Sequence, residues 1–276
     1  GIKIVSTGLV SVAKNIDVYE AYYHKEVAQT VCSTGDVLDV FSGVTDLGIG
    51  ALTSLVSVSD PWNVADNNSA TYATMRMGVG VLAAADLTVA FKTPSMAGDT
   101  LRLVVSSSMP ILQLNLLTAF SIQRFLGNVA VGDPIESSSS LLSLKLLSGG
   151  SQTAILVAPH VEPYDRVRIR FGGVASLLSS LNVHSVERAG NTKVIGGDLI
   201  NKVAVCSGGT LTLEVPPTAC STYNWYSSAV GGSILATGVK FSIPTTLLPG
   251  THKFYVQPVR FGCENLTRGE VTVLVR

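Results

Sequence analysis

Apolar and polar side chains alternate along several short stretches of this chain, and the alternation limits its fold more than any other feature. One stretch places Leu211, Leu213 and Val215 at every second position, between Thr210, Thr212 and Glu214. The same period of two recurs at 101–105, 167–171 and 271–275. Because successive side chains of a strand point to opposite faces of a sheet, each stretch predicts a strand with one buried and one solvated face.

Short turn sequences separate these stretches. They are rich in glycine, asparagine, aspartate and proline, as in Gly127-Asn128, Gly132-Asp133-Pro134, Gly231-Gly232 and Pro249-Gly250. Many short strands joined by such turns predict an all-β fold, a β-sandwich or jelly roll. Helical character is expected only as single turns at 94–96 and 176–181.

The composition excludes several classes of protein. Charged residues make up 14% of the 276 residues, against about 25% in ordinary globular proteins. Nineteen basic and nineteen acidic residues give a net charge of zero, so we expect no nucleic-acid partner. The high hydrophobic content excludes disorder. The longest apolar stretch, Met77–Ala85, is too short for a membrane span, which needs about 18 residues.

The sequence changes in character near residues 195–203, where glycine pairs precede a new series of strand-like stretches. We therefore predict two domains, residues 1–198 and residues 199–276. In the second, strands are expected near 210–215, 222–226, 240–243, 252–258 and 270–275, around a buried Trp225.

The second predicted domain carries a recognisable series of motifs: Val205-Cys206-Ser207-Gly208-Gly209, Tyr223-Asn224-Trp225-Tyr226, Gly262-Cys263-Glu264 and Arg268-Gly269-Glu270-Val271-Thr272-Val273. In order and spacing they resemble the immunoglobulin-like (Ig-like) modules of secreted and surface proteins of Bacteroidetes. That resemblance implies an Ig-like sandwich that acts as a spacer or adhesive unit. Such modules often precede a C-terminal sorting domain.

Four cysteines are present, and none forms a C-x-x-C pair, so zinc-ribbon and thioredoxin chemistry have no support. The Ig-like order implies that Cys220 and Cys263 lie at one end of the sandwich, which makes them the preferred disulfide. Cys206 with Cys263 is the competing pair, and Cys32 is expected as a buried or unpaired thiol. A disulfide fits an oxidising, extracellular setting.

The first predicted domain contains a polar loop between two strand-like stretches, within residues 56–75. This segment, together with Phe91-Lys92-Thr93-Pro94 and Pro163-Tyr164-Asp165-Arg166-Val167-Arg168-Ile169, resembles the discoidin and lectin-like jelly rolls of surface proteins. The resemblance implies a jelly-roll β-sandwich with a carbohydrate or another cell-surface polymer as its ligand.

The polar loop concentrates oxygen-bearing side chains that suit calcium. They are Asp60, Asp66, Asn67 and Asn68, and calcium takes six to eight oxygen ligands at flexible spacing. The alternative is that these side chains cap turns by accepting hydrogen bonds from nearby backbone amides. No EF-hand pattern is present.

Two further groups of residues are candidates for ligand binding. Arg166, Arg168 and Arg170 form a stripe on one face of a predicted strand, and guanidinium groups suit the carboxylate, sulfate or phosphate of a glycan. Trp62, in the polar loop, suits stacking on a sugar ring. The alternatives are a solvated strand face for the arginines and a plug at the end of the core for Trp62.

Catalytic motifs are missing from the sequence. The four histidines are scattered, and there is no H-E-x-x-H, G-x-S-x-G or P-loop pattern. We therefore expect a non-catalytic, secreted or cell-surface adhesion protein that binds carbohydrate through its first domain. The alternatives are a repeat unit of a large surface filament and a jelly-roll enzyme acting on glycosides.

Overall fold

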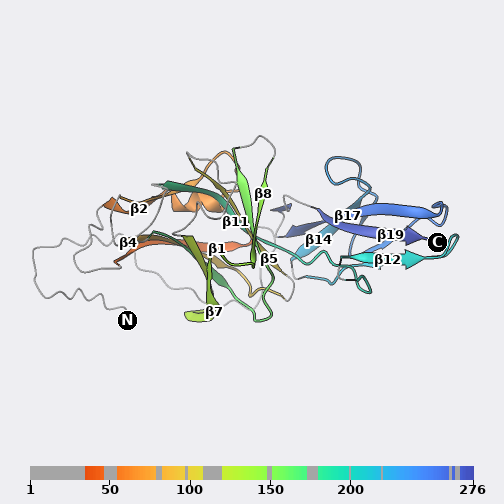
Figure 1. Ribbon diagram of the computed structural model, residues 1–276, viewed down its shortest axis with the longest axis horizontal. Helices are drawn as coiled ribbons and strands as arrows, with labels where there is room; N and C mark the ends of the chain where they lie inside the picture. The colour runs from red at the N-terminus through yellow and green to blue at the C-terminus, as the bar shows by residue number, and fades with distance from the viewer. Residues whose placement is uncertain are drawn as a thin grey trace, which may run out of the picture. The chain divides into compact units, whose positions relative to one another are not determined.

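The computed structural model describes residues 35–46, 55–78, 83–96, 99–107, 120–147, 151–172, 180–198, 200–218, 220–260, 263–264 and 268–276. All of them belong to one compact unit, Cys32–Arg276. These residues form β-strands and the short 3-10 helix η2, joined by turns and loops (Figure 1). The all-β prediction is confirmed. Cys32 lies outside the described residues.

The first half of the described chain forms two antiparallel sheets. The five-stranded sheet has the order β1 (Val37–Asp46), β4 (Ala83–Phe91), β10 (Arg166–Gly172), β6 (Phe120–Leu126) and β7 (Val129–Glu136). The six-stranded sheet has the order β2 (Ser57–Ser59), β3 (Ala73–Arg76), β11 (Ser180–Ala189), β5 (Thr100–Ser106), β9 (Thr153–Val157) and β8 (Leu142–Leu146). The chain passes from one sheet to the other several times, which gives a jelly-roll-type sandwich.

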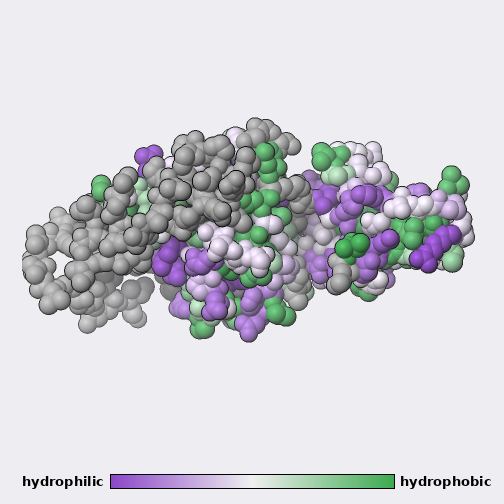
Figure 2. Space-filling model, in the orientation of Figure 1, coloured by the Kyte–Doolittle hydropathy of each residue, from purple (hydrophilic) through white to green (hydrophobic). Residues whose placement is uncertain are grey.

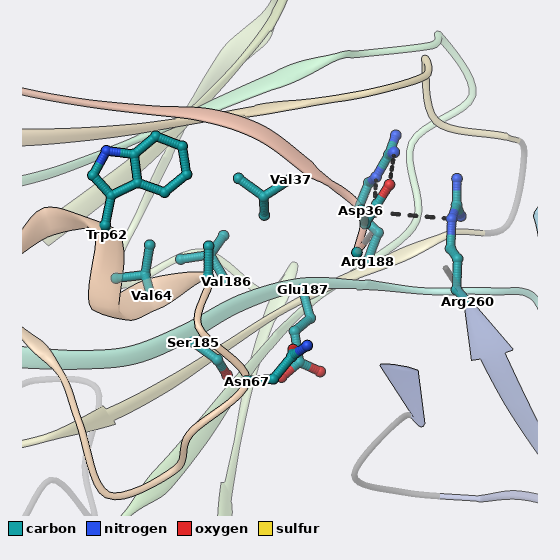
Figure 3. Close-up of a pocket in the computed structure, with 12 residues that line it drawn as sticks. Asp36, Val37, Trp62, Val64, Asn67, Ser185, Val186, Glu187, Arg188 and Arg260 are labelled. Carbon is teal, nitrogen blue, oxygen red and sulfur yellow. Dashed lines mark hydrogen bonds and ion pairs between the residues drawn. The ribbon is translucent and has the colours of Figure 1, made fainter. Parts of the chain in front are cut away.

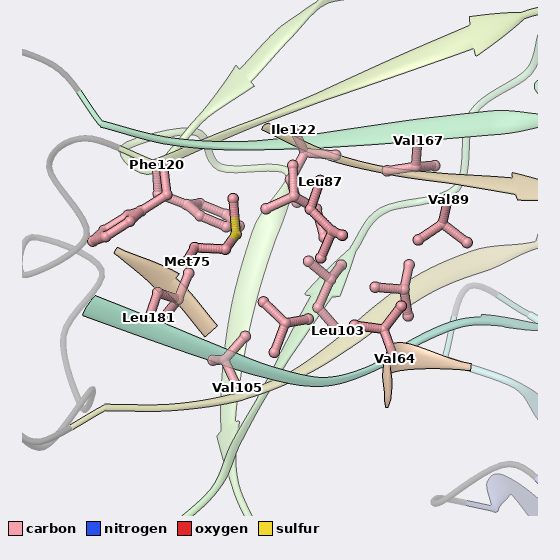
Figure 4. Packing of buried hydrophobic residues seen from close by; sticks show 14 of the residues in the cluster. Val64, Met75, Leu87, Val89, Leu103, Val105, Phe120, Ile122, Val167 and Leu181 are labelled. Atoms are coloured by element: carbon pink, nitrogen blue, oxygen red, sulfur yellow. The ribbon is translucent and has the colours of Figure 1, made fainter. Parts of the chain in front are cut away.

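The inward faces of the two sheets form one hydrophobic core. Leu87 of β4, Ile122 of β6 and Leu103 of β5 meet in its middle, with Met75 of β3 beside Phe120 (Figure 4). Along β10 the exposure alternates between buried and half-buried residues, as the sequence predicted. This alternation is what places the three arginines of β10 on the outer face of the five-stranded sheet.

One local prediction is wrong. The helical turn expected at 94–96 is irregular backbone, because its amide groups have partners elsewhere. The Ser95 N–H donates to the Tyr164 carbonyl at 2.7 Å, and the Met96 N–H donates to Asp99 Oδ2 at 2.9 Å. At the other expected turn, 176–181, Ser180 and Leu181 already belong to β11, and the preceding residues lie outside the described part.

The second half of the described chain forms a smaller sandwich. Its main sheet has the order β12 (Lys202–Val205), β19 (Gly269–Val275), β17 (Gly250–Arg260), β14 (Ser221–Tyr226) and β15 (Ala236–Thr237), with β18 (Cys263–Glu264) also on β17. The other sheet pairs β13 (Thr212–Glu214) with β16 (Lys240–Ser242). Trp225 is fully buried, stacks on Phe241 and donates its indole N–H to the Gly238 carbonyl at 2.9 Å. Its predicted role as core anchor is confirmed.

The two sandwiches have separate hydrophobic cores. The first core ends in sequence at Val186, and the second begins at Val194. The proposed boundary between residues 198 and 199 stays a prediction.

Polar and apolar side chains are interspersed over the described surface in Figure 2. No helix in the described ranges has the length and apolar character needed to cross a membrane.

Candidate functional site

A 3-10 helix, η2 (Pro61–Val64), presents Trp62 to solvent. It begins after Asp60, whose left-handed backbone turns the chain, and Pro61 supplies the fixed φ that suits a first helical position. The Asn63 N–H donates to the Asp60 carbonyl at 3.1 Å. Val64 is buried in the core, whereas the Trp62 side chain is 53% exposed. Trp62 is therefore available for a ligand and does not plug the core.

Trp62 stands beside a cavity of about 160 Å³. Apolar and polar side chains line it from opposite ends: Val37, Val64 and Val186 near Trp62, and Asn67, Asp36, Glu187, Arg188 and Arg260 farther away (Figure 3). The lining comes from the start of β1, from η2 and the loop after it, and from β11 and β17. An aromatic wall therefore stands next to several fixed polar groups.

The Asp36 carboxylate is held by a buried arginine. Arg188 donates from Nη2 to Asp36 Oδ1 at 2.6 Å and from Nε to Oδ2 at 2.8 Å. Its Nη1 donates to the Thr93 carbonyl at 2.7 Å, and its guanidinium lies 4.2 Å from the centre of the Phe91 ring. This two-point ion pair fixes both the position and the orientation of the carboxylate.

A second buried arginine reaches the same place from β17. Arg260 donates from Nη1 to Asp99 Oδ2 at 2.7 Å, and both residues are 2% exposed. Its Nε lies 3.9 Å from Asp36 Oδ2. The second sandwich thus supplies one wall residue of the cavity.

The other carboxylate of the cavity, Glu187, accepts a hydrogen bond from Nη2 of Arg102. Arg102 is 1% exposed, and burial lowers its pKa while the charge of Glu187 opposes that change. Its Nε and Nη1 have no hydrogen-bond partner in the structure as described. Glu187 is therefore committed to balancing a buried charge.

The predicted calcium ligands occupy a loop whose side chains bond to the protein itself. Asp66 accepts from the Asn68 N–H at 2.9 Å through Oδ1 and from the Thr71 hydroxyl at 2.7 Å through Oδ2. Asn68 Oδ1 accepts from the Ala70 N–H at 3.1 Å. Within the described residues, no three His, Cys, Asp or Glu side chains gather as a metal site requires. Calcium binding stays a prediction.

The arginine stripe lies on the outer face of the five-stranded sheet, and its members have different partners. Arg170 forms a two-point ion pair with Asp86, at 2.8 and 3.0 Å, and the hydrogen bond to Asp86 raises its pKa. Arg166 donates to Asn128 Oδ1 at 3.1 Å and lies 3.7 Å from Asp165. Arg168 lies over the Phe125 ring at 5.1 Å.

The structure separates the candidate ligand residues into two places. Trp62 and Asn67 line the first cavity, whereas Arg168 and Arg170 line a second one of about 270 Å³. Sequence reasoning missed Asp36, Glu187, Arg188 and Arg260 of the first cavity. The adjacent charges of Glu187 and Arg188 follow a stretch, 180–186, that has no Asp, Glu, Lys or Arg, and this contrast could have pointed to them.

The state of the cysteines excludes one of the two predicted disulfide pairings. Cys206 is free and exposed, so the competing pair of Cys206 with Cys263 is wrong. Cys220 is disulfide-bonded. Its pairing with Cys263 stays a prediction.

Comparison with known protein families finds a match for the second sandwich. Residues 198–276 match the family described as Ig-like domain CHU_C associated, which confirms the predicted Ig-like module. A search of curated proteins gave no match.

Among solved structures, the chain is similar to the CBM32-1, CBM32-2 and M60 catalytic domains of ZmpB from Clostridium perfringens, with 13% identity and a TM-score of 0.29, over 55% of this chain and 14% of that one. A β-1,2-glucanase from Parabacteroides distasonis matches with 9% identity and a TM-score of 0.38, and the match covers 88% of this chain and 38% of that one. A fucose binding module from Streptococcus pneumoniae matches with 12% identity and a TM-score of 0.30, and the match covers 60% of this chain and 98% of that one. The chain thus spans well under half the length of the first two.

Proposed function

We propose that this chain is a non-catalytic carbohydrate-binding protein of the cell surface or the extracellular space, with its ligand site at the Trp62 cavity. The observation that carries the proposal is an exposed indole at one end of a cavity whose farther end holds two carboxylates that arginines hold in place. An indole face packs against the apolar C–H face of a sugar ring, and carboxylates accept hydrogen bonds from its hydroxyl groups.

The fixed geometry of the cavity favours binding. Asp36 is held at two points by Arg188, and Trp62 is carried on a proline-initiated helix whose Val64 is anchored in the core. Little side-chain freedom is therefore lost when a ligand binds, which is the main advantage of a preorganised site.

The same ion pairs argue against glycoside hydrolysis at this cavity. That reaction needs one carboxylic acid to protonate the leaving group and a second carboxylate to act as base or nucleophile. Asp36 and Glu187 each accept hydrogen bonds from a buried arginine instead. This arrangement supports a binding role over the alternative of a glycoside-active enzyme.

The proposed setting is extracellular, and the match to the Ig-like family and the disulfide of Cys220 support it. We infer that the Ig-like sandwich acts as a spacer in an adhesion protein and also completes the wall of the cavity through Arg260. A repeat unit of a surface filament is the rival function, and it predicts no glycan ligand.

A glycan array tests the proposal. The 276-residue chain is screened once with millimolar calcium and once with EDTA, beside Trp62→Ala, Trp62→Phe and the surface control Val161→Ala, whose side chain is 89% exposed. We expect specific binding by the wild-type and control proteins, at least about tenfold weaker binding by Trp62→Ala, and partial retention by Trp62→Phe. Silence of the wild-type protein in both conditions would favour the filament.

A further inference from the structure

The second cavity lies on the outer face of the five-stranded sheet, across strands β10, β6 and β7. The register aligns Arg168 with Gln123 and Arg170 with Ser121, and it aligns Ser121 in turn with Glu136. Ser121 and Gln123 are two residues apart, so they share one face of β6. The sheet thus brings these five polar side chains to the cavity of about 270 Å³.

Two opposite charges line this cavity without neutralising each other. Arg170 is already paired with Asp86. The guanidinium of Arg168, by contrast, makes no hydrogen bond or ion pair within the described part of the chain, and its one contact there is with the Phe125 ring. Glu136 is exposed, and its carboxylate likewise has no such partner among the described residues. A guanidinium donor and a carboxylate acceptor therefore remain available to one ligand.

Gln123 adds a fixed acceptor. Its Nε2 donates to the carbonyls of Arg124 at 2.9 Å and Gly132 at 3.1 Å, and the residue is 6% exposed. Because the amide nitrogen is occupied, the carbonyl oxygen of Gln123 is the atom left for a ligand. The cavity therefore offers donors from arginine and acceptors from Gln123 and Glu136.

This arrangement changes the ligand expected from the arginine stripe. The sequence suggested an anionic group of a glycan as the ligand of this stripe, but the structure neutralises Arg170 with Asp86 and adds the negative charge of Glu136 to the same cavity. A sugar hydroxyl both donates and accepts, so adjacent hydroxyls satisfy a guanidinium and a carboxylate together. The volume lies just under the roughly 300 Å³ at which pockets for drug-sized ligands begin, which suits a single ring.

We propose that this outer-face cavity is a second carbohydrate subsite, which holds one neutral pyranose ring through Arg168, Glu136 and Gln123. The proposal rests on the proposed function, since it assumes that the chain binds carbohydrate. It is separate from the Trp62 cavity in every residue that lines it.

The test is NMR titration of the ¹⁵N-labelled 276-residue protein with the methyl glycosides of glucose, galactose, mannose and fucose, and with methyl glucuronide as the anionic probe. The Nε–H signal of Arg168 reports on the outer-face cavity, and the indole N–H signal of Trp62 reports on the first cavity. Arg168→Gln is the test variant. Arg166→Gln is the matched control, because Arg166 lies two residues away on the same face of β10 and is paired with Asn128 and Asp165.

We expect a neutral glycoside to shift the Arg168 signal in the wild-type, Trp62→Ala and Arg166→Gln proteins. In Arg168→Gln and in Glu136→Gln, the shifts of neighbouring amides should need at least about tenfold more ligand. If only Trp62 responds, the second subsite is refuted and the proposed function stands. If only methyl glucuronide shifts Arg168, the neutral-ring proposal is refuted. If neither reporter responds to any glycoside, both proposals fail.

Discussion

Replacing Tyr164 by phenylalanine is expected to stabilise the fold and to remove one source of its sensitivity to alkali. Tyr164 is 1% exposed, and its hydroxyl has no hydrogen-bond partner in the part of the chain that the structure describes. A buried hydroxyl without a partner costs about 1–3 kcal/mol. At pH 7 the Tyr164→Phe variant should therefore unfold at a higher urea concentration, with a gain of about 1 kcal/mol.

The pH dependence follows from the same burial. Burial raises the pKa of Tyr164 from the ordinary value of 10 to about 12, although the charges of Arg188 and Arg124 oppose this change. The unfolded chain therefore releases this proton at a lower pH than the folded protein does. The stability that the folded protein gains from keeping Tyr164 protonated is fully present below pH 10, and it is lost as the pH rises to about 12. Two pKa units correspond to about 3 kcal/mol.

Urea unfolding of both proteins between pH 7 and pH 11.5, followed by tryptophan fluorescence, measures this difference. Other groups titrate in the same range, so the quantity of interest is the gap between the two proteins at each pH. The gap should widen in favour of Tyr164→Phe above pH 10. A constant gap across the whole range would refute the reasoning.

Three further outcomes are expected. Asp99→Asn removes the ion pair that Asp99 forms with the buried Arg260, so urea unfolding should show a loss of about 3 kcal/mol that Arg260→Met partly restores. An unchanged midpoint would contradict the ion pair. Asp66→Ala removes two hydrogen bonds and should lower the free energy of unfolding by about 1 kcal/mol. The variant should melt at the same temperature in calcium and in EDTA. A calcium-dependent rise of the melting temperature in the wild type alone would establish a metal site. Peptide mapping without reductant should find Cys220 linked to Cys263, and a link to another cysteine would contradict that pairing.

The fold was largely predictable because alternation is a local signal. The stretch 167–171 appears as β10 and the stretch 271–275 as part of β19, each with the expected alternation of exposure. The immunoglobulin-like half was equally accessible, since Trp225 and its neighbouring motifs occur in a recognisable order.

The candidate site was predictable only in part. Trp62 was identified from its residue type and its polar surroundings, and it proves to be exposed. The carboxylates of the same cavity come from Asp36 and Glu187, which lie 151 residues apart in the chain, and no local pattern connects them. The arginines of β10 were correctly placed on one face, but the ion pairs of Arg170 with Asp86 and of Arg166 with Asp165 depend on strand pairing and loop contacts.

Fluorescence quenching at Trp62 tests the central claim most directly. The chain has two tryptophans: Trp62 is 53% exposed and Trp225 is fully buried, so acrylamide should quench the first and spare the second. A glycan that binds at the proposed cavity should protect Trp62 from acrylamide, and the protected fraction should follow the binding isotherm. In Trp62→Phe the protectable signal should vanish. A glycan that binds tightly and leaves the quenching of Trp62 unchanged would contradict the account.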